Sequence, residues 1–109
     1  MIVGSRSVKR FDLSKYVGND AELIISGGAK GIDSIAEEYA DKNKISKLIM
    51  YPDYKSFGKA APLKRNERMV ELSDVVIAVW DGASRGTKYT VDYARKQNKK
   101  IILVLHSPI

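Results

Sequence analysis

Apolar residues occur along this chain in five short runs, separated by longer stretches in which apolar and polar residues recur with helical spacing. Most of the runs are rich in Ile, Val and Leu and show no alternation of apolar and polar positions. Continuous apolar runs of this length predict strands buried on both faces, as in parallel sheets. The expected strands cover residues 1–3, 22–26, 47–50, 74–79 and 100–105.

The stretches between the runs predict amphipathic helices. In residues 31–44, apolar side chains recur at i, i+3, i+4, i+7 and i+8 from Ile32, and charged side chains occupy the other face. Further helices are expected over residues 60–73 and 87–98, with a short one near 14–17 and a loop over 51–58. Strands that alternate with helices imply parallel pairing through right-handed crossovers. We therefore expect one α/β domain over residues 1–109, a Rossmann-like three-layer sandwich with a central, mainly parallel five-stranded sheet.

Composition narrows the class of protein. The chain has 109 residues, of which 44% are hydrophobic, and this is enough for one core. It has no cysteine, which excludes disulfides, thiolate metal sites and cysteine nucleophiles. We expect a cytoplasmic protein with no membrane partner, because the sequence shows neither a signal peptide nor an apolar run long enough to span a bilayer. Its one histidine, His106, follows the last strand and is expected at the surface, and no metal-ligand spacing is present.

The net charge allows two interpretations. Nineteen Lys and Arg residues against thirteen Asp and Glu give a charge of +6, which favours polyanions such as nucleotides or nucleic acid. The alternative is a solvated, lysine-rich surface, since lysines are spread from Lys9 to Lys100.

Small, flexible or polar residues follow three of the expected strands. In a parallel sheet these strand ends meet at one edge, where ligands bind in doubly wound folds. Glycine allows close approach of the backbone to a ligand, and N–H groups at a helix start bind anions. The candidate ligand-binding residues are Gly4, Ser5, Arg6, Ser26, Gly27, Gly28, Ala29, Lys30, Asp33, Arg65, Asn66, Trp80, Asp81, Gly82, Ser84, Gly86 and Thr87.

Each of these features also has a purely structural explanation. The Gly27-Gly28 pair can form a tight turn, and Thr87 can cap its helix. Asp33 can complement a helix dipole, and Trp80 can belong to the core rather than stack on a ligand. Convergence of the three loops at one edge favours a ligand site over these separate explanations.

The order of these motifs resembles that of a known superfamily. The motifs are Gly4-Ser5-Arg6; Ser26-Gly27-Gly28-Ala29-x-Gly31-x-Asp33; Phe57-Gly58-Lys59-Ala60-Ala61-Pro62-x-x-Arg65-Asn66-x-x-Met69; and Asp74-x-x-Ile77-Ala78-x-Trp80-Asp81-Gly82-x-Ser84-x-Gly86-Thr87. From Met1 to about Leu105 the chain resembles the SLOG superfamily, which joins DprA (Smf) with the LOG enzymes, and within it the small YspA-like proteins. The resemblance implies a Rossmann-like fold, a ligand pocket at these loops, and binding of nucleotides, nucleotide-derived signals or single-stranded DNA. It also implies a homo-oligomer.

One departure from the LOG pattern bears on catalysis. LOG enzymes have Pro-Gly-Gly-x-Gly-Thr followed by a catalytic glutamate, whereas here Gly86-Thr87 follows Ala83-Ser84-Arg85 and the glutamate position is Tyr89. The expected function is therefore to bind a nucleotide or nucleotide-derived small molecule, as a sensor, a carrier or a signal-sequestering protein.

Two alternatives remain open. One is a hydrolase of an N-glycosidic or phosphate bond, with Asp33 and Asp81 as the candidate catalytic carboxylates and Glu67 as a more distant third. The other is binding of single-stranded nucleic acid, as in DprA, although the tyrosines form no run along the sequence.

Overall fold

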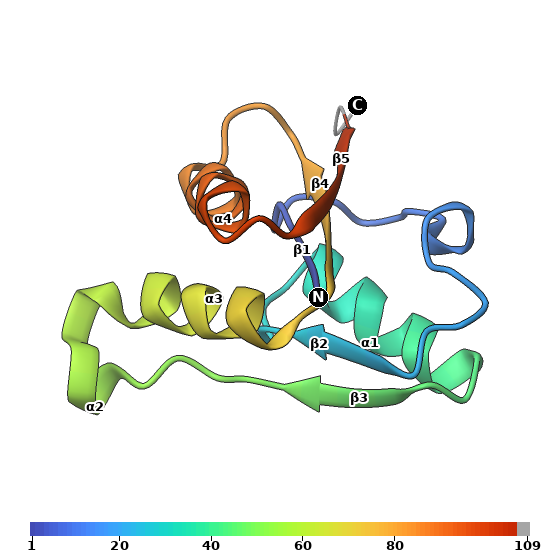
Figure 1. Cartoon of the computed structure of the whole chain (residues 1–109), viewed down its shortest axis with the longest axis horizontal. Coiled ribbons are helices and arrows are strands. Elements are labelled where there is room, and N and C mark those ends of the chain that lie inside the picture. Colours follow the sequence, from blue (N-terminus) through green and yellow to red (C-terminus); the bar gives the residue numbers. More distant parts are fainter. Residues whose placement is uncertain (107–109) are drawn as a thin grey trace.

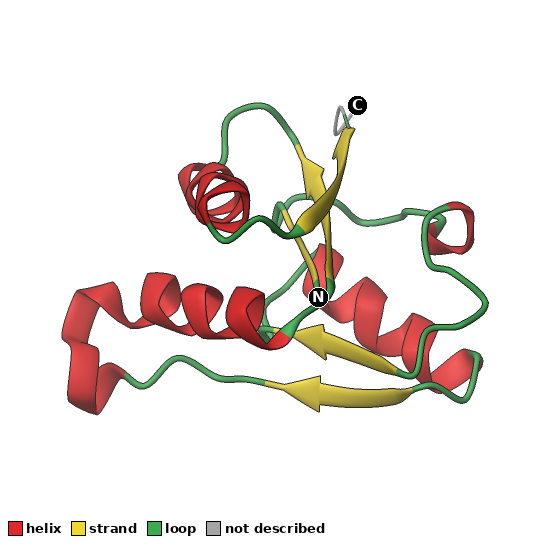
Figure 2. Cartoon of the chain, viewed as in Figure 1, coloured by secondary structure: helices red, strands yellow, loops and turns green. Residues whose placement is uncertain are grey.

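In the described part of the chain, five short strands alternate with helices, and every strand pair is parallel (Figures 1 and 2). This architecture comes from a computed structural model, which describes residues 1–106. The strands are β1 (Ile2–Gly4), β2 (Leu23–Ser26), β3 (Ser46–Ile49), β4 (Val75–Trp80) and β5 (Lys100–Leu105). The main helices are α1 (Ile32–Lys42), α3 (Ala61–Leu72) and α4 (Arg85–Lys96), and the shorter ones are η1 (Leu13–Lys15), α2 (Tyr54–Phe57) and η2 (Gly58–Ala60).

The positions expected from periodicity are confirmed for all five strands and for the three long helices, within two residues at each end. The stretch 51–58, expected as a loop, instead contains α2, whose first turn is capped when the side chain of Asp53 accepts a hydrogen bond from the Ser56 N–H. None of the helices in the described part of the chain is long and apolar enough to cross a membrane.

The prediction of one five-stranded sheet is wrong. The strands form a three-stranded sheet of order β1-β4-β5 and a separate two-stranded sheet, β2-β3. Strand β2 lies beside β1, but the β2-β3 pair turns away from the other sheet (Figure 1). Strand β1 has only three residues, and all of them pair with β4. Its other edge therefore offers few backbone groups that could hydrogen-bond to β2 and oppose the twist between these neighbouring strands.

Strands β2 and β4, one from each sheet, nevertheless divide their buried side chains between the same two core layers. From β4, Val76 and Ala78 join a cluster that packs under α3 and α4, whereas Ile77 and Val79 join a cluster on the α1 side. From β2, Ile25 and Ile24 divide in the same way. This period of two, with both faces apolar, explains why β2 and β4 appear in the sequence as continuous apolar runs. The expected burial on both faces is wrong for β3 and β5, which lie at sheet edges and contain no buried residue. The fold is therefore Rossmann-like, with helices on both faces of parallel strands.

Close packing between α1 and β1 accounts for two of the glycines. A Cβ at Gly4 would lie 2.5 Å from the Val79 carbonyl oxygen and 2.6 Å from Cγ1 of Ile32. Gly31 has φ +74°, and a Cβ there would lie 2.4 Å from the Ser5 carbonyl oxygen. These glycines let the start of α1 pack directly against the end of β1.

Candidate ligand-binding site

A pocket of about 430 Å³ opens where the carboxyl ends of β1 and β4 meet the starts of α1, α3 and α4. This is the edge at which open α/β sheets bind their ligands. The pocket is lined by Val3, Gly4, Ser5, Arg6, Ser7, Ala29, Asp33, Pro62, Leu63, Arg65, Asn66, Asp81, Ser84, Gly86 and Thr87.

Most of the residues that the sequence singled out line this one pocket. They are Gly4, Ser5, Arg6, Ala29, Asp33, Arg65, Asn66, Asp81, Ser84, Gly86 and Thr87. Six other candidates do not line it, namely Ser26, Gly27, Gly28, Lys30, Trp80 and Gly82. Sequence reasoning missed Val3, Ser7, Pro62 and Leu63, although helical spacing from Asn66 could have found the two on α3.

Asp33 is a buried carboxylate in the first turn of α1. Its side chain is 6% exposed, and its Oδ2 atom accepts a hydrogen bond of 3.1 Å from the Ala29 N–H. Burial raises the pKa of Asp33, although this hydrogen bond and the nearby Arg65 guanidinium oppose the shift. Asp33 thus stabilises the glycine-rich loop and also brings a perturbed carboxyl group to the pocket wall.

Ser26 serves the interior of the fold and not the pocket. It is fully buried, and its hydroxyl donates to Oε2 of Glu37, 3.0 Å away, and accepts from the Gly28 N–H. The expected role of Ser26 as a ligand donor is therefore replaced by a bridge between the end of β2 and helix α1.

Arg65 joins the ends of two strands. Its Nη1 atom donates to the carbonyl oxygens of Gly27, at 2.5 Å, and Met50, at 3.1 Å. The guanidinium lies over Gly27, where a Cβ would come within 2.8 Å of it. Burial lowers the pKa of Arg65, and the Asp33 carboxylate opposes that shift. The side chain therefore organises the loop and also presents positive charge to the pocket.

The loop between β4 and α4 is held by its own side chains. Oδ1 of Asp81 accepts hydrogen bonds from the N–H groups of Ala83, at 2.9 Å, and Ser84, at 2.8 Å, and these bonds lower the pKa of Asp81. The Asp81 N–H in turn donates to the Ser5 hydroxyl, which ties this loop to the one after β1. Trp80 contributes through its indole N–H, which donates to the Ser84 carbonyl at 2.9 Å.

The candidate glycines differ in what surrounds them. At Gly28, with φ +73°, a Cβ would lie 2.6 Å from the ring of Tyr51, and at Gly27 it would meet Arg65. No atom lies within 4 Å of a Cβ built at Gly82 or Gly86, and of these two only Gly86 lines the pocket. Protein packing thus explains the glycines at positions 4, 27 and 28, whereas no packing contact with the described residues explains the one at position 86.

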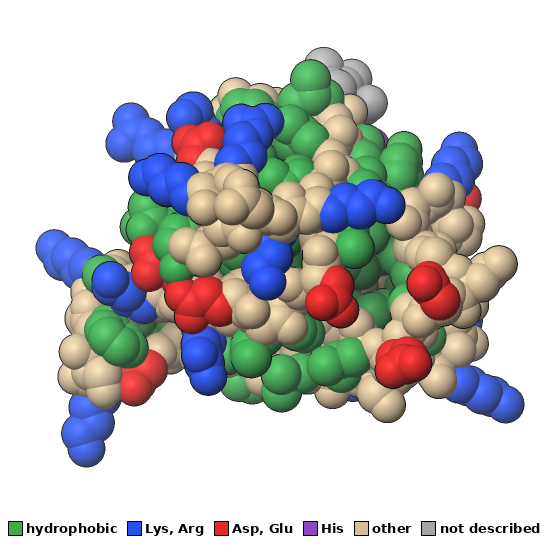
Figure 3. Space-filling view, viewed as in Figure 1, with side chains coloured by type: hydrophobic (Ala, Val, Ile, Leu, Met, Phe, Trp, Pro, Cys, Tyr) green, Lys and Arg blue, Asp and Glu red, His purple; other side chains and the backbone are tan. Residues whose placement is uncertain are grey.

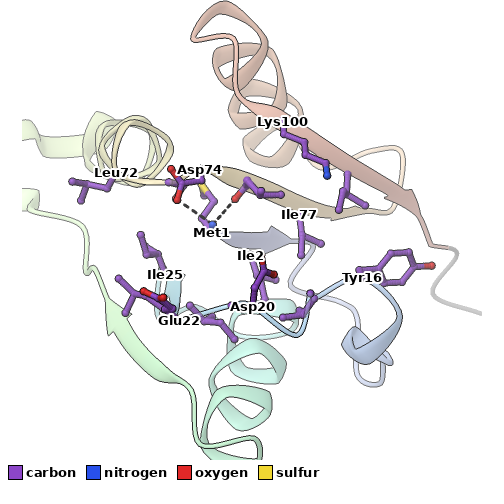
Figure 4. A pocket seen from close by; sticks show the side chains of 18 residues that line it. Met1, Ile2, Tyr16, Asp20, Glu22, Ile25, Leu72, Asp74, Ile77 and Lys100 are labelled. Atoms are coloured by element: carbon purple, nitrogen blue, oxygen red, sulfur yellow. Dashed lines mark hydrogen bonds between the residues drawn. The ribbon is translucent and has the colours of Figure 1, made fainter.

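A larger pocket, of about 630 Å³, lies at the opposite ends of the strands (Figure 4). Its walls include Ile2, Ile25 and Ile77, and it occupies the space left where β1 and β2 do not pair. The Met1 ammonium group beside it donates to the Ser73 hydroxyl and the Val75 carbonyl, and burial lowers its pKa to about 6. None of the sequence-predicted binding residues lines this pocket, so we take the smaller one as the candidate site.

No lysine and no histidine of the described residues lines the candidate site. On the face shown in Figure 3, Lys and Arg side chains are scattered over the middle and around the edge, with Asp and Glu among them, as expected of a solvated surface. Lys30 does not line the candidate site. His106 is half-buried and packs edge-on against Phe11, with ring centroids 5.5 Å apart. In residues 1–106, no group of three or more His, Asp or Glu side chains is placed to hold a metal ion.

Comparisons with known proteins give one partial similarity. Over 40 residues, the chain is 42% identical to the uncharacterized SPbeta prophage-derived protein YoqJ of Bacillus subtilis (strain 168). The matched segment is 37% of this chain and 23% of that protein. No protein-family model matches the sequence, and no solved structure matches it.

Proposed function

We propose that this chain binds a nucleotide or nucleotide-derived small molecule in the 430 Å³ pocket, as a sensor, a carrier or a signal-sequestering protein. The observation that carries the proposal is the gathering of two arginines, two aspartates and a helix N-terminus around one cavity at the carboxyl edge of the strands. Small-molecule sites have volumes of about 300–1,000 Å³, so the cavity suits a ligand of mononucleotide size.

The N-terminus of α4 is the natural phosphate subsite. Ser84, Gly86 and Thr87 line the pocket at the start of this twelve-residue helix, where free N–H groups and the helix dipole attract anions. The space in front of Gly86 is open, so a phosphate oxygen can approach the backbone. Arg6, exposed on the loop after β1, supplies a positive charge to the same cavity.

The other groups of the pocket suit a sugar or a base. Asp33 and Asp81 can accept hydrogen bonds from ribose hydroxyls, and Leu63 and Pro62 offer apolar surface. The resemblance to the SLOG superfamily supports the proposal, because its four motifs supply most of the pocket lining.

The first experiment follows the melting temperature of the protein with nucleoside monophosphates, their nucleosides, ribose 5-phosphate, inorganic phosphate, nucleotide-derived signals and short single-stranded oligonucleotides. Because a ligand stabilises the state that binds it, a mononucleotide should raise the melting temperature more than its nucleoside does. If only oligonucleotides stabilise the protein, with an affinity that falls steeply with salt, single-stranded nucleic acid replaces the small molecule.

Arg6→Gln tests the phosphate contact. It removes a charged partner in the pocket, and we expect a loss of about 10- to 100-fold in nucleotide affinity, since a hydrogen bond to a charged group contributes about 1.5–3 kcal/mol. Lys9→Gln is the matched control, because it removes an equal charge from an exposed site on the same loop outside the pocket. Equal effects of the two variants would show that Arg6 acts only through net charge.

A second candidate function is hydrolysis of an N-glycosidic bond. Asp33 and Asp81 line the same pocket, and their pKa values shift in opposite directions, which is the usual division between an acid and an ionised partner. Asp33 would give its proton to the leaving base as the C1′–N bond breaks. Water would form the new C1′–O bond and lose its proton to Asp81.

Chromatography of the recovered ligand separates the two functions. An intact nucleotide supports binding, whereas base plus sugar phosphate supports hydrolysis. Hydrolysis would then show a bell-shaped pH profile, lost at high pH as Asp33 ionises and at low pH as Asp81 becomes protonated. The homo-oligomer remains a prediction, which light scattering of the purified protein tests.

A further inference from the structure

A continuous chain of buried and partly buried hydrogen bonds connects the two loops on either side of the candidate site. Thr90 on α4 donates from its hydroxyl to the Gly86 carbonyl, and Nδ2 of Asn66 donates to Thr90 Oγ1, both at 2.8 Å. Nε of Arg65 donates to Oδ1 of Asn66 at 2.7 Å, and Nη1 continues to the Gly27 carbonyl. The chain thus runs from the start of α4, across α3, to the glycine-rich loop after β2.

The two central residues of this chain have few alternative hydrogen-bond partners. Thr90 is 1% exposed and Asn66 is 7% exposed, so neither can exchange its partner for bulk water. Among the described residues, no buried side-chain nitrogen or oxygen lacks a hydrogen-bond partner. Buried polar networks that are fully satisfied fix the relative positions of their members.

We propose that Thr90 is a positioning residue for the ligand site, acting through Asn66 and Arg65 to fix the glycine-rich loop relative to the N-terminus of α4. Thr90 does not line the pocket, and the sequence motifs do not include it. The inference rests on the proposed function for its ligand-binding consequence. A ligand that reaches from the α4 N-terminus to the Asp33 side of the pocket depends on this spacing, whereas inorganic phosphate at the α4 N-terminus alone does not.

The test compares Thr90→Val with Thr90→Ser. Valine keeps the shape of the side chain but removes the hydroxyl, so the Asn66 amide loses its acceptor, whereas serine keeps the hydroxyl. The first readout needs no ligand. It is amide hydrogen exchange at Gly28 and Ala29, whose N–H groups donate to Ser26 and Asp33 in the distant loop. We expect exchange there to accelerate by about tenfold or more in Thr90→Val, the scale of one lost buried hydrogen bond, and to be restored in Thr90→Ser.

Asn66→Ala interrupts the same chain at another link and provides a second variant if Thr90→Val does not fold. This variant keeps the hydrogen bond from the Thr90 hydroxyl to the Gly86 carbonyl, so no buried donor on α4 loses its acceptor. It should reproduce the faster exchange at Gly28 and Ala29. Unchanged exchange at these two amides in a folded variant, or equal exchange in Thr90→Ser and Thr90→Val, would overturn the proposal.

The second readout is affinity for a nucleoside monophosphate and for inorganic phosphate. We expect Thr90→Val to weaken the nucleotide by about tenfold, the scale of one hydrogen bond, and inorganic phosphate much less. Equal loss for both would contradict the positioning role. If the wild-type protein binds neither, the proposed function fails, and the exchange experiment still decides whether Thr90 positions the loop.

Discussion

The open space in front of Gly86 leads to a prediction that separates folding from binding. Gly86 is the second residue of α4, and nothing lies within 4 Å of a Cβ built there. Alanine is favoured over glycine in helix interiors by about 1 kcal/mol, so Gly86→Ala should leave the free energy of unfolding unchanged or slightly higher. The new methyl group would project into the space through which a phosphate approaches the helix N-terminus.

The magnitude follows from the contacts that the methyl group would block. Loss of one hydrogen bond to a charged group, about 1.5–3 kcal/mol, weakens the ligand by at least about tenfold. At a ligand concentration of 100 times the wild-type dissociation constant, the ligand adds about 2.7 kcal/mol of stability to the wild-type protein. After a tenfold loss of affinity the same concentration adds only about 1.4 kcal/mol. The rise in melting temperature caused by the ligand should therefore fall to about half.

The assay is thermal unfolding with and without a nucleoside monophosphate that stabilises the wild-type protein. Gln97→Ala, an exposed neutral change at the other end of α4, is the binding control. Gly4→Ala is the comparison variant for folding. It should lower the melting temperature without ligand, because its Cβ would overlap the Val79 carbonyl and Ile32. Overpacking of this kind costs about 1–3 kcal/mol, with about 4–8 °C of melting temperature lost per kcal/mol. If Gly86→Ala folds and responds to the ligand as the wild type does, the ligand does not lie at the start of α4.

Variants at two further residues test the electrostatics and the capping of the site. Asp33→Asn should gain stability relative to the wild type as the pH rises from about 4 to 8, because the pKa of Asp33 is raised in the folded state. The protonated Asp33 carboxyl stabilises the wild-type protein fully below the pKa of the unfolded state. This stabilisation is lost as the pH rises through the pKa of the folded state. Urea unfolding across this pH range measures the difference, and a difference that does not change with pH would contradict the assignment. Ser84→Ala removes the side-chain acceptor for the Thr87 N–H and should cost about 1 kcal/mol, whereas Ser84→Asp should keep most of the stability and weaken an anionic ligand. Equal melting temperatures for Ser84→Ala and the wild type would show that this cap contributes nothing.

The sequence by itself determined where the strands and long helices lie, because that information is local. A strand buried on both faces must be apolar at every position, and a helix that covers a sheet must repeat its apolar residues with helical spacing. Parallel pairing then brings the strand ends to one edge, which is why residues as distant as Ser5, Asp33 and Asp81 could be predicted to meet. Apolar periodicity did not mark α2, a four-residue helix whose N-cap is Asp53.

Only the tertiary structure decided what each residue at that edge does. Arg65 and Gly27 are 38 positions apart, and their contact assigns the guanidinium to two backbone carbonyls and the glycine to packing. The separation of β2 from β1 depends likewise on how a three-residue strand twists against its neighbour. Such contacts between distant residues leave no periodic trace in a sequence, because either partner alone is compatible with many environments. Periodicity therefore predicted the framework of this protein, and long-range packing set the geometry of its pocket.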